Sequence, residues 1–343
     1  MTITVATDAD RALWDDYVLR HPHGMPYQRW AWRQAVAEAY GHGAIYLLAR
    51  SGDRVAGVLP LVNFAVPGRG AALISLPYCD VGGALAETPE TMEELRQAAI
   101  EQMRQTSAKT LELRTLAAPS GTDDPVSKVL MLLDLPRGAA TLLAGLKAKL
   151  RSQVNKPLRD GLHSQLGGAE LVDAFYQVFS RNMRDLGSPV HSKAWIRSVA
   201  SAYGDDARIG VVRLPDGSPV AAGMILLHGT RISVPWASSL RSHNKLNANV
   251  LLYWTFLSFA ADHGFTSFDF GRSTPGEGTY RFKGQWGARP SPLRWVSVGR
   301  DGEERVLVSR PGRLRRGVES LWKQLPLPLC NAVGPQIRRH LSL

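Results

Sequence analysis

A ten-residue block occurs twice in the chain at a fixed spacing, and this repeat constrains the fold more than any other feature. Residues 32–41 read WRQAVAEAYG, and residues 195–204 read WIRSVASAYG. Six positions are identical at an offset of 163 residues: Trp, Val, Ala, Ala, Tyr and Gly. Because self-similarity at a fixed period indicates a duplicated structural unit, the repeat predicts two copies of one domain.

The segments around each block correspond as well. Each block is preceded by a helical pattern and followed by a hairpin, a third strand, a long helix and a further strand. The strands are expected at 45–50, 55–61, 71–76 and 110–114 in the first half, and at 209–214, 220–226, 232–238 and 267–271 in the second. The flanking helices are expected at 9–19, 89–106, 171–186 and 247–263. Three antiparallel strands followed by a helical crossover predict an α+β domain with a mixed sheet.

Length and composition agree with two globular domains. The chain has 343 residues, of which 44% are hydrophobic and 21% charged. The two cysteines, Cys79 and Cys330, are far apart and form no metal-binding spacing, so we expect reduced thiols and no structural zinc. The first residues do not resemble a signal peptide, and the longest apolar run, 250–261, is too short to cross a bilayer. These features predict a soluble, cytoplasmic protein.

The charge balance is unusual, with 41 Lys and Arg against 30 Asp and Glu, a net charge of +11. It fits either a well-solvated basic surface or an anionic partner such as a nucleic acid, a phosphorylated substrate or an acidic membrane. The basic residues of the stretch between the halves are Lys147, Lys149, Arg151, Lys156 and Arg159. This stretch is expected to be a solvated helical linker or a basic lip over an anionic substrate.

The C-terminal segment has a character of its own. Residues 310–343 hold seven Arg or Lys residues and one acid, Glu319, around an apolar helical pattern that includes Trp322 and Leu325. This pattern predicts either a helix packed on the second domain or a basic amphipathic segment resting on anionic lipid. The expected organisation is therefore a first domain at 1–140, a basic helical linker at 141–165, a second domain at 166–305 and a basic tail at 306–343.

Four segments carry a resemblance to a known family: residues 150–156, 182–191, 268–273 and 278–287. The last reads GTYRFKGQWG and is similar to the Phe-Lys…Phe-Gly signature of Fem proteins, with Trp for the second Phe. The chain resembles the FemABX aminoacyltransferases, and more closely the FemAB-like proteins associated with exosortase/PEP-CTERM exopolysaccharide systems. The resemblance implies a tandem GNAT-like fold and the transfer of an acyl or aminoacyl group to an amine.

The donor is left open by the residues. Acyl-CoA enzymes of the GNAT fold carry a glycine-rich phosphate loop after the fourth strand, where backbone N–H groups meet phosphates. The corresponding junction here, residues 238–247, has no glycine, and residues 77–84 have two glycines in a different pattern. We therefore expect weak acetyl-CoA binding and no tightly bound cofactor, with aminoacyl-tRNA or acyl-CoA as the co-substrate. Arg241 and Lys245 could still contact phosphates from a loop of another shape.

The resemblance and the residue chemistry together predict the site. Asp269, Lys283 and His191 are the expected catalytic residues, since a transfer to an amine needs a proton acceptor and groups that stabilise charge. The residues expected to bind substrate are Tyr27, Tyr78, Asp80, Asn182, Arg184, Asp185, Trp236, Ser238, Arg241, Arg272 and Tyr280. For Asp269 the alternative is an ion pair with Arg272, and for His191 it is a structural role. Asn247 is expected to cap the helix that follows it.

Two functions remain open from the sequence. The first is a FemAB-like N-acyltransferase acting on an amine of a cell-envelope precursor or amino sugar, with tRNA as a possible partner and residues 310–343 as a possible peripheral membrane contact. The second is a catalytically reduced binding or scaffold protein of an exopolysaccharide assembly system. The chain contains no Gly-x-Ser-x-Gly, P-loop or His-Glu-x-x-His motif, which argues against serine-hydrolase, nucleotide-kinase and zinc-enzyme functions.

Overall fold

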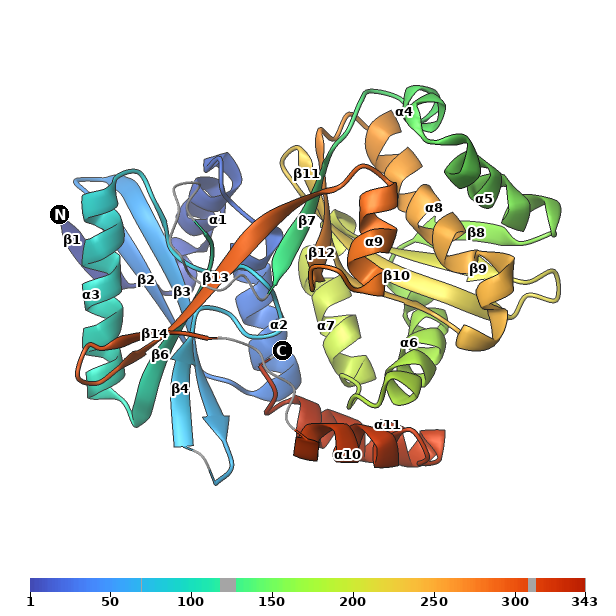
Figure 1. Ribbon diagram of the computed structural model, residues 1–343. Coiled ribbons are helices and arrows are strands. Elements are labelled where there is room, and N and C mark those ends of the chain that lie inside the picture. Colours follow the sequence, from blue (N-terminus) through green and yellow to red (C-terminus); the bar gives the residue numbers. More distant parts are fainter. Residues whose placement is uncertain (69, 118–127, 308–312, 343) are drawn as a thin grey trace. The chain divides into compact units, whose positions relative to one another are not determined.

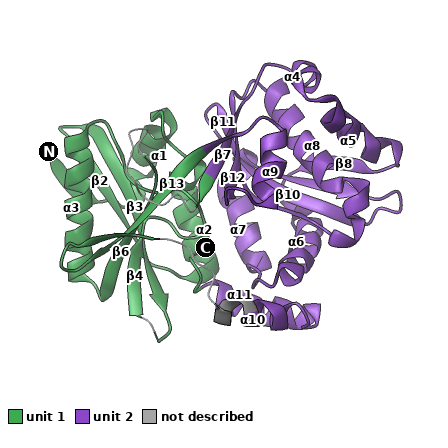
Figure 2. Cartoon of the chain, viewed as in Figure 1, with its two compact units in different colours: residues 1–129, 291–309, 340–343 green, residues 130–290, 310–339 purple. Residues whose placement is uncertain are grey.

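The computed structural model describes residues 1–68, 70–117, 128–307 and 313–342 of the chain, which forms two compact units (Figures 1 and 2). Unit 1 comprises residues 1–129, 291–309 and 340–343. Unit 2 comprises residues 130–290 and 310–339.

Unit 1 is a mixed sheet with helices on both faces. Its strands are β1 (Thr2–Val5), β2 (Ala44–Ser51), β3 (Arg54–Val66), β4 (Gly70–Ile74), β5 (Leu85–Ala86), β6 (Ala108–Leu116), β13 (Arg289–Gly299) and β14 (Glu304–Val306). Its helices are α1 (Arg11–Arg20), α2 (Trp30–Tyr40) and α3 (Pro89–Gln105). The strand order is β1-β2-β3-β4-β6-β13, and β4 and β6 are the parallel pair.

The two faces of the unit 1 sheet are covered by different side chains because successive residues of a strand point to opposite faces. Leu47 lies in the buried cluster that includes Leu95 and Met103 of α3. Its neighbour Tyr46 packs on the other face, where its ring lies 4.7 Å from that of Trp14 and 5.4 Å from that of Trp30. The aliphatic and aromatic layers together form the core of unit 1.

Unit 2 repeats this plan. Its strands are β7 (Val129–Asp134), β8 (His163–Gly167), β9 (Ala207–Arg213), β10 (Pro219–His228), β11 (Arg231–Ser239) and β12 (Ser267–Ser273), in the order β7-β12-β11-β10-β9-β8. Its helices are α4 (Ala139–Gly145), α5 (Ala148–Arg159), α6 (Val172–Leu186), α7 (Lys193–Tyr203), α8 (Ala248–Asp262), α9 (Gly278–Gln285), α10 (Arg313–Trp322) and α11 (Leu327–Arg338). Strands β8 to β11 are antiparallel, whereas β11 and β12 run parallel.

The predicted duplication is confirmed. Trp32 on α2 and Trp195 on α7 are both fully buried, and each helix directly precedes three antiparallel strands. The second strand of each set also carries an equivalent glycine under the crossover helix. A Cβ on Gly57 would lie 2.9 Å from a Leu95 side-chain carbon of α3, and one on Gly223 would lie 2.9 Å from the Phe256 ring of α8. Glycine at both positions lets the helix approach the sheet closely.

The compact units divide the chain differently from the expected ranges. Residues 141–165 are helical in large part, as expected, but they belong to unit 2 instead of linking two domains. Leu150 and Val154 form a buried stripe on α5, which packs against α8. In addition, most of β7 belongs to unit 2 and most of β13 to unit 1, where β13 pairs with β6. Strand β7 thus opens the continuous segment of unit 2, whereas β13 joins unit 1 from beyond that segment.

The expected C-terminal tail forms α10 and α11, which belong to unit 2. Trp322 of α10 and Cys330 of α11 are buried, and α11 packs against α6. Among the described residues, no helix combines the length and the apolar character needed to cross a bilayer. Residues 308–312 of the predicted tail lie outside the described part of the chain.

Candidate functional site

The parallel strands of unit 2 separate halfway along their length. Strand β11 pairs with β12 through three residues only, and the last pair is Ser233 with Asp269. Beyond this pair β11 continues to Ser239 and β12 to Ser273, without pairing with each other. The backbone of β11 on this side is therefore available to a ligand.

A bulge in β11 accompanies the separation. Between Ser233 and Trp236 the register of β11 against β10 shifts by one residue. Pro235 lies in this interval and has no N–H group to donate to a neighbouring strand, which is why proline in sheets is found at bulges and edges. The proline thus gives a local reason for the irregular course of β11 at this point.

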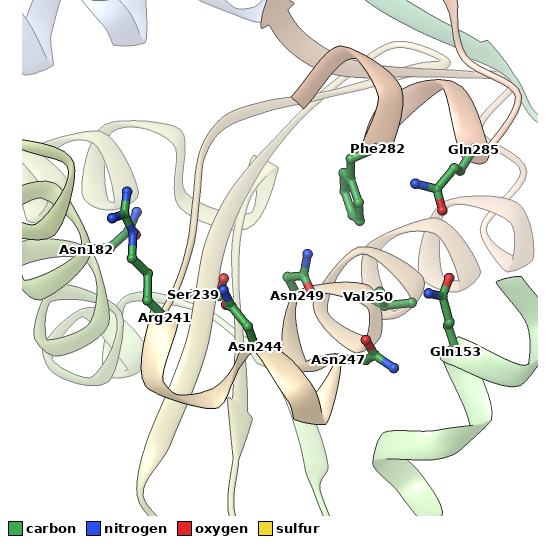
Figure 3. Close-up of a pocket in the computed structure, with 10 residues that line it drawn as sticks. All are labelled: Gln153, Asn182, Ser239, Arg241, Asn244, Asn247, Asn249, Val250, Phe282 and Gln285. Carbon is green, nitrogen blue, oxygen red and sulfur yellow. The ribbon is translucent and has the colours of Figure 1, made fainter. Parts of the chain in front are cut away.

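A cavity of about 420 Å³ lies where β11 ends and α8 begins (Figure 3). Asn182 and Arg241 lie at one end of the pocket, and Gln153 and Gln285 lie at the other. The full lining comprises Gln153, Asn182, Ser239, Arg241, Asn244, Asn247, Asn249, Val250, Phe282 and Gln285. Asn182 and Arg241 are the two predicted site residues among them.

The electrostatic character of this pocket is simple. Its lining has no carboxylate and one cation, Arg241, with amide and hydroxyl groups making up most of the remainder. Among the described residues, neither Arg241 nor the nearby Lys245 has a hydrogen-bonding or ion-pairing partner. The N-terminus of α8 contributes a further positive partial charge, because the first N–H groups of a helix lack partners within it. The pocket therefore favours an anionic or neutral polar group.

Asn247 occupies the N-cap position of α8, as predicted, but its side chain makes no capping hydrogen bond. Its backbone is left-handed, with φ of 55°, and its amide side chain lines the pocket instead. Asn adopts the left-handed conformation more readily than most residues other than glycine, which suits it to this turn into α8.

Asp269 and Lys283 hold one turn at the end of β12. Oδ1 of Asp269 accepts a hydrogen bond from the backbone N–H of Gly271 at 2.7 Å. Nζ of Lys283 donates to the carbonyl oxygens of Gly271 and Arg272 at 3.0 and 2.8 Å. Both side chains are buried. In this arrangement they position the backbone beside the separated strands, with Lys283 bound to main-chain oxygens.

His191 has surroundings that do not fit the predicted catalytic role. Its side chain is 1% exposed, and its Nε2 accepts a hydrogen bond from Nε of Arg338 at 3.0 Å. Its ring packs 5.8 Å from that of Trp195 and 6.0 Å from that of Trp236. Burial and the adjacent guanidinium hold the pKa of His191 well below its usual value. This imidazole is neutral and already occupied, so the structure favours the structural alternative.

Other predicted residues of unit 2 lie around this region. Nδ2 of Asn182 donates to Oγ of Ser238 at 3.0 Å, which joins α6 to β11 beside the pocket. Arg184 and Asp185 form an ion pair with each other at 2.7 Å. Tyr280 lies on α9, partly exposed, and its hydroxyl has no hydrogen-bonding partner among the described residues.

Three predicted site residues belong to unit 1. Tyr27 is buried with its ring 5.0 Å from that of Trp32. The hydroxyl of Tyr78 lies 3.0 Å from Nε2 of His42, and both groups are buried. The backbone oxygen of Asp80 accepts a hydrogen bond from Nε1 of Trp295. The two tyrosines thus contribute to the core of unit 1.

In unit 1 the position equivalent to the strand separation is filled by the chain itself. After β4 the chain folds back, so that the N–H groups of Gly82 and Gly83 both donate to the carbonyl oxygen of Arg114, at 3.1 and 2.9 Å. The buried Arg114 guanidinium donates in turn to the carbonyl oxygens of Cys79 and Ser342, each at 3.1 Å. A Cβ on Gly82 would lie 2.5 Å from the backbone oxygen of Ser75. This packing leaves the strand edge of unit 1 occupied.

Sequence reasoning missed most of the pocket lining. Gln153, Asn244, Asn249 and Gln285 are neutral polar residues that carry no recognisable catalytic motif. A usable signal was present in the close spacing of Asn244, Asn247 and Asn249 at the junction where the glycine-rich loop is absent.

Comparisons with known proteins agree with this geometry. Residues 146–284 match the family described as "Acetyltransferase (GNAT) domain". A comparison with curated proteins finds no match. Among solved structures, FemX has a TM-score of 0.67 at 14% identity, covering 94% of this chain and 100% of its own.

Two further solved structures are similar. A tandem GNAT protein from the clavulanic acid biosynthesis pathway has a TM-score of 0.53 at 14% identity, covering 87% of this chain and 98% of its own. The C-terminal domain of a putative lysylphosphatidylglycerol synthetase from Agrobacterium fabrum has a TM-score of 0.54 at 16% identity, covering 83% and 91%. At these identities the likeness to solved structures shows a shared fold, and the match of residues 146–284 supports an acyltransferase. Residues 146–284 are therefore similar to a GNAT acetyltransferase domain, and the chain as a whole has the fold of FemX and of a tandem GNAT protein.

Proposed function

We propose that the protein is a FemAB-like N-acyltransferase whose reaction takes place in unit 2, on an amine of a cell-envelope precursor or amino sugar. The observation that carries this proposal is the separation of β11 from β12 after Ser233 and Asp269, next to a polar pocket at the start of α8. The match of this half of the chain to a GNAT acetyltransferase domain supports the same assignment.

The chemistry follows from the unpaired edge of β11. The amine nitrogen of the acceptor attacks the carbonyl carbon of the donor, so that a C–N bond forms and the bond from that carbon to the sulfur or oxygen of the donor breaks. The amine loses a proton to solvent, and the departing thiolate or alkoxide gains one. Backbone N–H groups beyond the last β11–β12 pair are suited to stabilise the oxyanion of the tetrahedral intermediate.

The pocket indicates which donors fit best. Arg241, Lys245 and the N-terminus of α8 suit a donor that carries phosphate groups, as acyl-CoA and aminoacyl-tRNA both do. An aminoacyl group also brings an ammonium, and the lining offers it amide and hydroxyl oxygens but no carboxylate. This balance favours an acyl group without a charged amine. Unit 1, whose equivalent edge is filled, then serves a purpose other than donor binding.

One observation favours the second candidate, a catalytically reduced binding protein. Asp269 and His191, the two expected proton acceptors, are both buried and both engaged in hydrogen bonds within unit 2. Such a protein would bind the donor in the pocket without transferring its acyl group.

A transfer assay with radiolabelled donors distinguishes the candidates. Acetyl-CoA, longer acyl-CoAs and aminoacyl-tRNA are each incubated with the full chain and with glucosamine or a nucleotide-linked amino sugar. Arg241→Glu should abolish donor binding, whereas Arg159→Glu, on the exposed end of α5, should not. Labelled amide product supports the enzyme. Donor binding that depends on Arg241, without product from any acceptor, supports the binding protein.

A further inference from the structure

Helix α11 presents an apolar stripe on its exposed side. Leu329, Val333 and Ile337 are spaced by four residues and are 45%, 40% and 40% exposed. This spacing places them on one face of a helix. The residues that follow the first two of them, Cys330 and Gly334, are buried, about 100° around the helix from the stripe. The helix is thus packed on unit 2 by one face while a second apolar face remains uncovered.

Helix α10 carries two further exposed apolar side chains. Its Val318 is 55% exposed and its Leu321 is 68% exposed, the highest exposure of any large apolar side chain among the described residues. The two helices form a hairpin, since Sγ of Cys330 lies 3.9 Å from the backbone oxygen of Trp322 and both side chains are buried (Figure 1). We call the five exposed side chains, Val318, Leu321, Leu329, Val333 and Ile337, the hairpin face.

The hairpin is held to unit 2 by contacts that do not use this face. Arg338 donates to His191, and Gly334 packs against the backbone of Val190. The backbone of Glu319 on α10 lies close to Gly187. A Cβ added to Gly187 would lie 2.5 Å from the backbone oxygen of Glu319. The hairpin face can therefore bind another surface while the hairpin stays docked.

The charge of this segment indicates the kind of surface. Residues 310–343 carry seven Arg or Lys residues against Glu319, a net charge of +6 before histidines are counted. Lys323, in the turn between the helices, is exposed and has no ion-pairing partner among the described residues. Two copies of this chain meeting through their hairpin faces would bring two such segments together and repel each other. An anionic surface is the complementary partner.

We propose that the hairpin face binds the surface of an anionic phospholipid membrane. The aliphatic side chains would enter the boundary between headgroups and acyl chains, and Lys323 would pair with lipid phosphates. The exposed side chains of the face are all aliphatic and include no Tyr, Trp or Arg, the residues that dominate specific protein interfaces. This composition fits a fluid lipid surface better than a shaped protein pocket. The proposal does not depend on the proposed reaction.

Flotation of the full chain with large unilamellar vesicles tests this inference. We expect binding to vesicles of 70% phosphatidylcholine and 30% phosphatidylglycerol, weaker binding to pure phosphatidylcholine, and loss of binding as salt is raised. Val333→Asp should reduce the partition coefficient by about tenfold or more, because it removes an apolar contact and adds a repelled charge. Leu158→Asp is the matched control, since Leu158 of α5 is 49% exposed but lies outside the hairpin face. It should change partitioning much less.

Lys323→Glu provides a second, electrostatic test, with Arg159→Glu as its control for net charge. A variant is included in the comparison only if its melting temperature matches that of the wild type. We expect this match because the substituted side chains are exposed. The proposal is overturned if anionic vesicles do not bind the wild type, or if Val333→Asp and Leu158→Asp bind alike. It is also overturned if sedimentation equilibrium shows a dimer that Val333→Asp dissociates, because the face would then bind a second copy.

Discussion

Arg338 donates a hydrogen bond from its Nε to Nε2 of His191 across 3.0 Å, and so fastens the last turn of α11 to the loop between α6 and α7. A histidine nitrogen can accept this bond only while it carries no proton. The rings of Trp195 and Trp236 enclose the imidazole, and the hydroxyl of Tyr176 donates to its backbone oxygen. The docking of the C-terminal hairpin is therefore coupled to the protonation state of one buried histidine.

This coupling predicts a dependence of stability on pH. Burial and Arg338 hold the pKa of His191 well below 6.5, so the unfolded state binds a proton at a higher pH than the folded state does. Stability is then fully present above about pH 6.5 and is lost as pH falls toward the folded-state pKa. Urea denaturation between pH 5 and pH 8 should show the free energy of unfolding falling on the acid side. His191→Gln, which does not titrate, should flatten this dependence, and identical slopes for the two proteins would contradict the prediction.

Lys283→Met is expected to destabilise unit 2. The substitution leaves the carbonyl oxygens of Gly271 and Arg272 without the ammonium that now binds them. Buried hydrogen bonds to a charged group contribute more than neutral ones, so we expect a loss of about 2–4 kcal/mol in the free energy of unfolding. The control is Lys245→Met, at an exposed lysine without a partner among the described residues. Lys283→Met with an unchanged melting temperature would instead favour the catalytic role predicted from the sequence.

Tyr280→Phe should lower turnover while leaving stability unchanged. The Tyr280 hydroxyl is partly exposed on α9, and no described residue binds it, so its removal breaks no contact within the protein. If the hydroxyl contacts the substrate or protonates the leaving group, the rate should fall by about 100-fold. Steady-state kinetics together with thermal melting checks this expectation. Full activity in the variant would remove Tyr280 from the site.

Gly82→Ala should destabilise unit 1 without affecting donor binding in unit 2. A Cβ at this position would lie 2.5 Å from the backbone oxygen of Ser75 and 2.7 Å from Cβ of Leu76, so the filled strand edge would have to shift. Overpacking of this kind costs about 1–3 kcal/mol. Gly43→Ala is the control, because a Cβ at Gly43 meets no atom within 4 Å. Calorimetric unfolding and donor titration separate the two effects, and lost donor binding in Gly82→Ala would place a donor site in unit 1.

The sequence by itself determined the elements and their duplication. Apolar periodicity and turn residues act over short distances, so the helices and the three-strand sets were predicted close to their observed bounds. The repeated Trp-to-Gly block indicated equivalent helices, and Trp32 and Trp195 do lie on them. The absence of glycine from residues 238–247 also predicted an unusual junction, because it is visible in the residue types alone.

Only the tertiary structure decided which strands complete each unit and what the polar side chains do. A strand pattern specifies its faces but not its neighbour, so nothing in the sequence of β13 indicated that it joins unit 1, from which residues 130–290 separate it. The pKa of His191 is lowered by its burial and by Arg338, which lies 147 residues away in sequence. Lys283 likewise binds carbonyl oxygens that only the turn after β12 presents. Periodicity also cannot tell a face that packs on the protein from one that remains exposed, as Cys330 and Leu329 of α11 show, because burial is decided by contacts between segments distant in sequence.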